Sequence, residues 1–448
     1  MSDRRPDAVV VGGGLSGLVA ARDLAAAGLS VLVLEGSPVV GGKLRTASVA
    51  DVELDVGAES MLARRPEGVE LAAELGVPLV HPASRSSQLW TRGELRPLPR
   101  TLLGVPLDPE ALAASGVLSD EGLARAAHET VLPLGDQDVS VAELIGSRLG
   151  HEVVDRLAEP LLGGVYAGHV DNLSAQAAIP QVVSLLRAHG SLLAAARAVR
   201  AASDAPVFAG VEGGLGAIPR LLAARLDVRT SATVRGLARA GSGFRLTVGS
   251  ARTPEAVETD RVVLATPAAP SARLLAEVAP NAARELAAVE YASMAIVTLA
   301  VPALDVAGSS GFLVPALDGR QIKAATYSFS KWAWVGAASE LRLLRASLGR
   351  HREEAVLQAS DDELVARVVG DLSLATGQPV VPVDAHVQRW GGALPQYAVG
   401  HPDRIRRVRA AIGAVPGLEV CGAAYDGVGV PAVVGSARGS AARLLAAQ

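Results

Sequence analysis

Three glycines and one acidic residue near the N-terminus have the types and the spacing needed to hold a dinucleotide. Gly12, Gly14 and Gly17 form the pattern G-x-G-x-x-G. The first glycine permits a tight turn, the second lets the main chain approach a pyrophosphate, and the third lets a helix pack closely on strands. Glu35 follows Gly17 by 18 residues (35 − 17), where a carboxylate binds both ribose hydroxyls and disfavours the 2′-phosphate of NADP.

The surrounding sequence predicts the elements that must position these residues. Ala8–Val11 is a short, valine-rich apolar run, typical of a buried strand. Leu15–Ala27 carries apolar residues on one face and stops at Gly28, which predicts a helix. Ser30–Leu34 predicts a second strand. A helix that begins in the glycine loop offers free N–H groups and a positive dipole end to phosphates.

A second glycine pair favours FAD over NAD. Gly41 and Gly42 lie just downstream of Glu35 and are followed by Lys43 and Arg45. Bare glycines there let another main-chain segment lie against an extended dinucleotide, with two cations near its phosphates. The segment 55–60 supplies a further loop. Because an NAD domain needs neither segment, the sequence predicts bound FAD.

The composition indicates a globular chain with two or three domains or sub-domains. Half of the 448 residues are hydrophobic, but no run approaches the ~18–20 apolar residues of a membrane-spanning helix. The apolar run Ala8–Ala21 after Arg4 and Arg5 imitates a secretory signal, but three glycines interrupt it. A net charge of −4 gives no reason to expect nucleic acid as a partner. The single cysteine, Cys421, fits a reducing compartment, so we expect a cytoplasmic protein.

Several kinds of catalytic site are missing from the sequence. The eight histidines are scattered without metal-ligand spacing, so no metal site is expected. No nucleophile elbow or phosphate-binding P-loop sequence is present. Cys421 lies in an apolar run and is interpreted as a small core residue. With no obvious catalytic acid or base, we predict that the flavin carries the chemistry and the protein positions it.

The rest of the chain predicts a mainly helical stretch followed by strands. Residues 120–205 look helical, and core packing is favoured over membrane contact for their apolar, arginine-bearing segment Val182–Val199. Strands are expected around Val228–Val234, Phe244–Val248 and Arg261–Ala265.

The C-terminal region predicts a strand, a glycine loop and a final helix. The strand is expected at Gly417–Cys421 and the loop over residues 422–431. A helix that begins there and points its N-terminus at the flavin pyrimidine would stabilise the negative charge of the reduced ring.

Three segments resemble a known family. They are Glu159–Gly168, Arg389–Tyr397 and Tyr425–Pro431. All three closely resemble the protoporphyrinogen oxidase family, in particular its bacterial coproporphyrinogen III oxidases. The likeness runs from the first strand to the last helix. It implies an α/β fold of the flavin amine oxidase type, with a Rossmann-like FAD domain assembled from separated segments, an α+β substrate domain and a helical sub-domain.

The resemblance also implies a division of the chain and a reaction. We expect residues 1–80, 207–270 and 386–448 in the FAD domain and 271–385 in the substrate domain. Residues 81–206 are expected in a mainly helical sub-domain that forms a substrate channel or faces a membrane. The implied reaction is the six-electron oxidation of a porphyrinogen in haem biosynthesis, in three two-electron steps whose electrons pass to molecular oxygen. Peripheral membrane contact and hand-over of the product to a ferrochelatase are further implications.

Site residues follow from matching positions in the family motifs. The substrate residues implied are Arg65, facing a propionate, and Gly164, beside the macrocycle. Position 59 departs from the family's commoner Gly-Pro-Asp-Ser loop, which weakens a role for the Glu59 side chain. The implied flavin contacts are Gly12, Gly13, Gly14, Leu15, Ser16, Gly17, Glu35, Gly36, Gly42, Lys43, Gly57, Ala58, Glu59, Ser60, Val234, Trp390, Val428, Gly429 and Val430.

The residues leave the substrate open. Coproporphyrinogen has four propionates and protoporphyrinogen two, so the first needs more cations around its pocket. The arginines at 64–65 and 85–100 are compatible with that need but do not decide it. A flavin amine oxidase would share the first sixty residues but should show an aromatic cage near the C-terminus. A carrier that holds the pigment for a chelatase is the non-enzymatic alternative.

Overall fold

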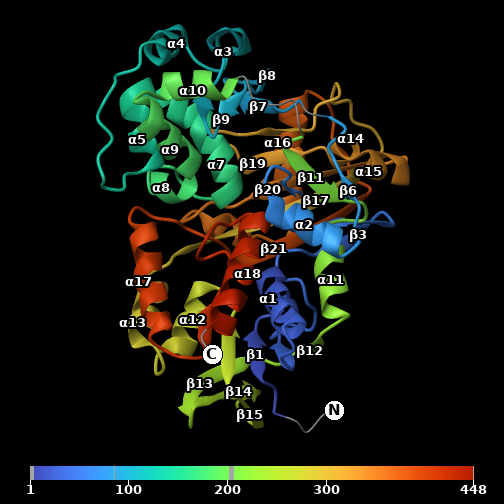
Figure 1. Ribbon diagram of the computed structural model, residues 1–448. Coiled ribbons are helices and arrows are strands. Elements are labelled where there is room, and N and C mark those ends of the chain that lie inside the picture. The colour runs from blue at the N-terminus through green and yellow to red at the C-terminus, as the bar shows by residue number, and fades with distance from the viewer. Residues whose placement is uncertain (1–4, 85, 201–205, 447–448) are drawn as a thin grey trace.

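The computed structural model describes residues 5–84, 86–200 and 206–446. Figure 1 shows a parallel-sheet region at the bottom, with both ends of the chain near it, and a mainly helical region at the top left beside a large mixed sheet. Neighbouring strands are often far apart in the sequence. Each region is therefore built from several separate parts of the chain.

The parallel sheet has the strand order β12-β2-β1-β16-β22. Its strands are β1 (Ala8–Val11), β2 (Val31–Leu34), β12 (Asp227–Arg229), β16 (Arg261–Leu264) and β22 (Leu418–Val420). Strand β1 pairs in parallel with both β2 and β16, and all four of its residues are buried. A strand enclosed on every side carries no polar residue, which is why its sequence is uniformly apolar. The predicted first strand is confirmed.

One face of this sheet shares an apolar core with a group of helices. They are α1 (Leu15–Ala26), α2 (Pro66–Glu74), α11 (Ala217–Ala223) and α18 (Val430–Ala446). Helices α1 and α18 pack against each other, and their buried apolar residues share one core. The first and last helices of the chain therefore stand side by side over the sheet (Figure 1). Small sheets next to them contain β3 (Thr46–Val49) with β4 (Val52–Asp55), and β5 (Met61–Leu62), β11 (Phe208–Val211) and β6 (Leu79–Val80).

A three-stranded antiparallel sheet follows β12. It contains β13 (Val234–Ala240), β14 (Gly243–Gly249) and β15 (Pro254–Thr259), and α12 (Ala268–Leu275), α13 (Pro280–Ala287) and α17 (His401–Gly413) share its core. The prediction of one strand over Val228–Val234 is wrong. Strand β12 ends at Arg229, and the left-handed φ of 53° at Ser231 turns the chain before β13 begins. Strand β15 was not predicted.

The large mixed sheet has seven strands in the order β21-β17-β20-β19-β18-β7-β8. They are β7 (Gln88–Thr91), β8 (Glu94–Pro97), β17 (Tyr291–Val301), β18 (Gly311–Leu313), β19 (Ile322–Thr326), β20 (Arg342–Leu348) and β21 (Asp384–Pro395). Helix α16 (Asp361–Thr376) packs on one face through a shared apolar core. The connections contain α14 (Ser328–Lys331), α15 (Ala333–Ala338) and the 3₁₀ turns Ala316–Asp318 and Glu354–Gln358.

This sheet contains strands from outside the expected substrate segment 271–385. Strands β7 and β8 come from the segment expected to be mainly helical. Strand β21 falls almost wholly in the expected 386–448 part of the FAD domain, but it pairs with β17 from Tyr291 to Ala300. The domain boundaries stay a prediction, but the hydrogen-bonded strands cross two of them.

The helical region lies to the left of the large sheet in Figure 1. It contains β9 (Thr101–Leu102), β10 (Val105–Pro106), α3 (Pro109–Ser115), α4 (Asp120–Ala127), α5 (Val141–Leu149), α6 (His151–Val153), a π-helical turn (Val154–Ala158), α7 (Glu159–Tyr166), α8 (Ala175–Ala178), α9 (Pro180–His189) and α10 (Leu192–Arg200). The apolar segment Val182–Val199 falls on α9 and α10, which meet at a bend of 105°. Val182, Leu186 and Leu192 are buried in the region's core, in agreement with the core-packing interpretation. Within the described ranges, no single helix is both long and apolar enough to cross a membrane.

The start of α1 depends on glycine. Gly12 has a φ of 110°, in the region that favours glycine, and a Cβ on Gly17 would lie 1.9 Å from the carbonyl oxygen of Gly12. Any side chain at position 17 would therefore push the helix away from the strand that precedes it. The third glycine of the motif has the packing role that its spacing predicted.

We expect Gly17→Ala to lower the free energy of unfolding by about 2 kcal/mol or more, because the methyl group has no room. Gly370→Ala is the matched control: Gly370 is exposed in α16, and its added Cβ would meet nothing within 4 Å. That variant should gain about 0.5–1 kcal/mol, since alanine favours the helix. Urea unfolding of both variants measures the difference, and equal stabilities would contradict the packing argument.

Candidate functional site

Glu35 and the two glycine segments lie together at the carboxyl end of β1 and β2. The Gly13 N–H donates a hydrogen bond to Glu35 Oε2 at 2.6 Å, and the Gly41 N–H donates to the Gly13 carbonyl at 2.8 Å. A Cβ on Gly42 would lie 3.2 Å from the Cα of Gly14. The two glycine segments therefore form one bare main-chain surface next to the carboxylate.

This surface fits the pyrophosphate of a dinucleotide. Helix α1 begins after Gly14, and no side chain caps the free N–H groups of its first turn. Donors of this kind, at the positive end of a helix dipole, bind phosphate oxygens. Side chains at Gly14 and Gly42 would fill the space, so the donor set and the room both suit the cofactor expected from the sequence.

The ribose end of the expected site is closed by the start of β13. The Ala232 N–H donates to the Glu35 carbonyl at 2.8 Å. A Cβ on Gly36 would lie 3.3 Å from Thr233 Oγ1. The structure therefore brings Val234, the first residue of β13, next to the segment Glu35–Gly36, although about 200 residues separate them in the sequence.

Trp390 and Gly57 meet in the next part of the site. Trp390 Nε1 donates to the carbonyl of Val56 at 3.0 Å. A Cβ on Gly57 would lie 2.0 Å from the carbonyl oxygen of Lys43 and 3.2 Å from Trp390 Cζ2. The Arg45 guanidinium lies over the indole of Trp390, 5.7 Å from the ring centre. Segments 43–45, 56–57 and 390 thus converge in space.

The side chain of Glu59 has a structural task. Its carboxylate accepts from Lys331 Nζ at 2.5 Å and from Arg345 Nη1 at 3.2 Å, and at most 15% of each of the three side chains is exposed. Burial alone would raise the pKa of Glu59, but the two cations more than offset it and hold this pKa at about 2. We call Glu59, Lys331 and Arg345 the ion triad.

The ion triad holds the loop after β4 against the large sheet. Arg345, on β20, also donates to the carbonyls of Asp55 at 2.9 Å and Gly57 at 2.8 Å. The carboxylate of Asp55 accepts from the N–H groups of Leu215 and Gly216, and burial raises the pKa of this carboxyl to about 6. Sequence reasoning missed Lys331 and Arg345 because neither belongs to a motif.

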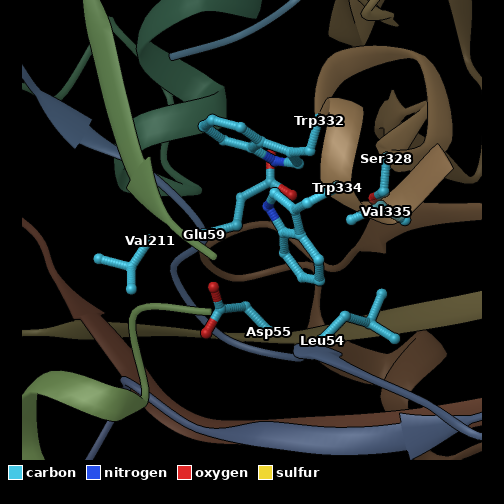
Figure 2. Close-up of a pocket in the computed structure, with 8 residues that line it drawn as sticks. All are labelled: Leu54, Asp55, Glu59, Val211, Ser328, Trp332, Trp334 and Val335. Carbon is cyan, nitrogen blue, oxygen red and sulfur yellow. The ribbon is translucent and has the colours of Figure 1, made fainter. Parts of the chain in front are cut away.

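A small cavity lies behind the same loop. Figure 2 shows Asp55, Glu59 and Trp334 around one narrow space. Its lining residues are Leu54, Asp55, Glu59, Val211, Ser328, Trp332, Trp334 and Val335. With a volume of about 10 Å³ it admits nothing larger than water, so it is not a substrate site. Ser328 Oγ and Trp334 Nε1 are buried there without a hydrogen-bond partner among the described residues.

The two expected substrate residues lie in different settings. Gly164 is exposed on α7, beside the half-exposed Val165, and a Cβ there would lie 3.7 Å from Leu313 Cδ2. The absence of a side chain at Gly164 leaves this face of α7 bare. Arg65 precedes α2, is half exposed, and pairs with Glu67 at 2.5 Å. Across the described chain, no hydrogen bond or ion pair joins Arg65 to α7.

The three segments that resemble the family meet in space. Gln396 Nε2 donates to the carbonyl of Tyr166 at 2.8 Å. Tyr397 Oη donates to the carbonyl of Ala423 at 2.6 Å and accepts from the Gly427 N–H at 2.9 Å. Helix α18 begins three residues later, after Val428 and the exposed Gly429. The α7 segment, the end of β21 and the start of α18 therefore form one connected unit.

The three lysines of the chain lie in the candidate site or in residues that pack next to it. The chain has 39 arginines (42 − 3) but three lysines: Lys43, Lys323 and Lys331. Burial lowers the pKa of Lys43 to about 8. Burial also lowers the pKa of Lys323, on β19, to about 7, and its Nζ has no hydrogen-bond partner in the described structure. Lys323 lies near Glu159 and Arg350, at the base of the helix that carries Gly164. The scarcity of lysine was the sequence signal that could have found these residues.

Other groups are accounted for by packing. Cys421 is fully buried, its Sγ lies 3.9 Å from the carbonyl of Ser16, and burial raises the pKa of its thiol to about 12. It is the core residue that the sequence predicted. Within the part of the chain that the structure describes, no cluster of three or more His, Cys, Asp or Glu side chains could hold a metal ion.

We expect Glu59→Gln to leave two buried cations without a counter-charge and to lower the free energy of unfolding by about 3–5 kcal/mol at pH 7. The folded pKa of about 2 lies below the ordinary 4.5, so this stabilisation is complete above about pH 4.5 and is lost as the pH falls towards 2. The gap between wild type and variant should therefore narrow at pH 3.

Glu53→Gln is the control for the ion triad. Glu53 pairs with Arg220 at the surface, where both side chains are more than half exposed, so its loss should cost less than about 1 kcal/mol. Denaturant unfolding at pH 7 and pH 3 measures both variants. A Glu59→Gln protein as stable as the Glu53→Gln protein at pH 7 would overturn the role given to the ion triad.

The chain was compared with known proteins. Residues 15–445 match the family described as flavin containing amine oxidoreductase. The chain is 37% identical to the coproporphyrinogen III oxidase of Mycobacterium leprae, with 98% of both chains covered, and 30% identical to the protein of that name from Bacillus subtilis, with 96% of both covered. A solved structure from Exiguobacterium sp. 255-15, provisionally named protoporphyrinogen oxidase, superposes with a TM-score of 0.89 at 30% identity and full coverage of both chains.

The match spans the glycine loop, the large sheet and the last helix alike, so it covers the whole site described above. It also confirms the fold class expected from the sequence, an α/β fold of the flavin amine oxidase and protoporphyrinogen oxidase type. The chain belongs to the flavin-containing amine oxidoreductases and, within them, to the protoporphyrinogen oxidase family.

Proposed function

We propose that this protein is an FAD-dependent oxidase that converts coproporphyrinogen III to coproporphyrin III in haem biosynthesis. One observation carries the proposal: the three segments that resemble the family form a single unit, which joins the bare face of α7 to the turn before α18. This connection supports a site for a flat macrocycle next to the expected flavin site. Relatives named coproporphyrinogen III oxidase align over nearly the whole chain, which supports the substrate.

The reaction balances with oxygen as the acceptor. Coproporphyrinogen loses six electrons and six protons when it becomes coproporphyrin, and three molecules of oxygen take these up as three molecules of hydrogen peroxide. FAD supplies the two-electron redox chemistry that no amino-acid side chain offers. The protein contributes binding, orientation and electrostatics, and no side chain is assigned as catalytic acid or base.

Different residues of the chain are assigned to binding, orientation and electrostatics. The N–H groups at the start of α1 hold the pyrophosphate, and Glu35 holds the ribose. The N-terminus of α18 carries a partial positive charge that favours negative charge on the reduced ring. Gly164 leaves room for the macrocycle, and Arg65 is assigned to a propionate at the edge of the site. Turning Arg65 from Glu67 to a carboxylate of the substrate exchanges one ion pair for another.

Two alternative substrates are included in the activity test. Protoporphyrinogen IX has the same ring with two propionates in place of four, so it fits the same bare face with fewer cations. An amine is the substrate type implied by the name of the wider family. Reoxidation by oxygen, peripheral membrane contact, hand-over to a ferrochelatase and a cytoplasmic location stay predictions of the sequence.

Lysine chemistry offers a direct test of the cofactor site. With three lysines in the chain, an amine-selective reagent has few targets, and Lys323 and Lys331 are too buried to react in the folded protein. Lys43 is only partly buried, and a pKa of about 8 leaves much of it neutral and nucleophilic at pH 8. Bound FAD should slow its acetylation about tenfold or more, as read by mass spectrometry. Equal rates with and without saturating FAD would remove Lys43 from the site.

Activity is tested by adding freshly reduced coproporphyrinogen III to the FAD-loaded protein in air and following porphyrin fluorescence, with protoporphyrinogen IX and putrescine in parallel. Fast formation of coproporphyrin, with three molecules of peroxide per porphyrin, is the expected result. A preference for protoporphyrinogen would move the enzyme to the dicarboxylate substrate. Oxidation of the amine alone, or of none of the three by protein that holds oxidised FAD, would overturn the proposal.

A further inference from the structure

Tyr397 lies where the three family segments meet, directly after β21. Its side chain is 2% exposed and stacks on the ring of His401, with 4.0 Å between ring centres. On the other side the ring faces Tyr166, at the end of α7, at 5.6 Å. Ring packing alone therefore holds the aromatic ring between the helical region and α17, without any contribution from the hydroxyl group.

The hydroxyl group of Tyr397 bridges the two ends of the turn before α18. It donates to the carbonyl of Ala423 and accepts from the N–H of Gly427. These two bonds use the donor and one acceptor position of the hydroxyl. Gly427 has a φ of 132°, and a Cβ there would lie 2.7 Å from the Cβ of Ala432, so the turn is tight. This side-chain oxygen therefore helps to fix the path of the chain into the last helix, together with Ser436 and Arg409, which both bind the carboxylate of Asp426 in the same turn.

The neighbouring residue fixes α7 in the same way. Gln396 Nε2 donates to the carbonyl of Tyr166, and a Cβ on Gly168 would lie 1.9 Å from Gln396 Oε1. The main chain of Tyr397 adds a further bond, because its carbonyl accepts from the Ser174 N–H at 2.7 Å. The dipeptide Gln396–Tyr397 therefore ties the helix that carries Gly164 to the turn that starts α18.

We propose that Tyr397 is a positioning residue for the reaction: its hydroxyl sets where the N-terminus of α18 stands relative to α7, and hence how the flavin ring and the macrocycle face each other. The inference rests on the proposed function, since it assigns the flavin to α18 and the macrocycle to α7. Small displacements between reacting groups are costly, because the rate of transfer depends steeply on their distance and alignment.

Tyr397→Phe tests this proposal, because it keeps the stacked ring and removes only the hydroxyl. We expect faster hydrogen exchange of the amides in residues 423–427, measured on the FAD-free protein. We also expect a shifted flavin absorption spectrum and a lower flavin midpoint potential, because the positive end of α18 is no longer held in place. With porphyrinogen, kcat should fall about tenfold while KM changes less than about twofold.

Tyr327→Phe is the matched control. Tyr327 is 1% exposed in the core under the large sheet, and its hydroxyl has no hydrogen-bond partner among the described residues. The same chemical change there should leave the flavin spectrum, the potential and kcat as in the wild type. His401→Ala provides a second comparison: it removes the stacked ring but keeps the hydroxyl, so it should lower thermal stability with little effect on the flavin potential.

Two results would overturn the proposal. One is a Tyr397→Phe protein whose exchange rates, flavin spectrum and potential all match those of the Tyr327→Phe protein. The other needs no variant: an amide of Gly427 in the wild type that exchanges as fast as an open loop would mean that the bridge does not form. Exchange, spectrum and potential do not depend on the substrate, so they test Tyr397 even if the porphyrinogen assignment fails.

Discussion

A buried carboxylate between two cations joins the two main parts of this structure. Glu59 belongs to the loop that follows the dinucleotide-type segments, whereas Arg345 lies on β20 of the large sheet and Lys331 ends α14, in a connection of that sheet. Taking three charges out of water costs several kcal/mol per ion, so the arrangement survives only because each charge has close partners. Arg345 recovers part of that cost by also binding the carbonyls of Asp55 and Gly57. The loop that is expected to face the flavin is thus held by Arg345 on β20 of the large sheet.

The ion triad is one of several contacts between the glycine-loop region and the large sheet. A loop fixed to the sheet at Gly57 also carries the contact of Gly57 with Lys43, and Trp390 on β21 closes the same space. Each crossing adds a hydrogen bond or a packing contact between residues hundreds of positions apart. A cofactor that spans both parts then meets surfaces whose relative position is already set, which lowers the cost of organising the site during reaction.

The sequence was most informative where structure is decided locally. Ala8–Val11 and the helix after it follow from apolar pattern and glycine spacing, and both form as predicted. The single strand expected over Val228–Val234 fails because apolar alternation does not reveal the left-handed turn at Ser231. The ion triad could not be predicted from the sequence for a different reason. Glu59 was known only as a departure from a motif, and its partners lie 272 and 286 residues further along, in segments with no motif at all.

The distribution of cations gives the site a property that sequence motifs did not reveal. Arginine keeps its charge in every environment, and this chain uses it for its surface ion pairs. Burial lowers the pKa of lysine where no counter-charge offsets it, and the three lysines lie at the expected phosphate site, in the ion triad and under α7. Lys331 keeps a carboxylate partner at 2.5 Å, whereas Lys323 has none and its pKa falls to about 7. The charge of Lys323 beneath α7 therefore depends on pH near neutrality, next to the permanent charge of Arg350. An arginine at position 323 would have added a second permanent charge beneath α7, beside that of Arg350.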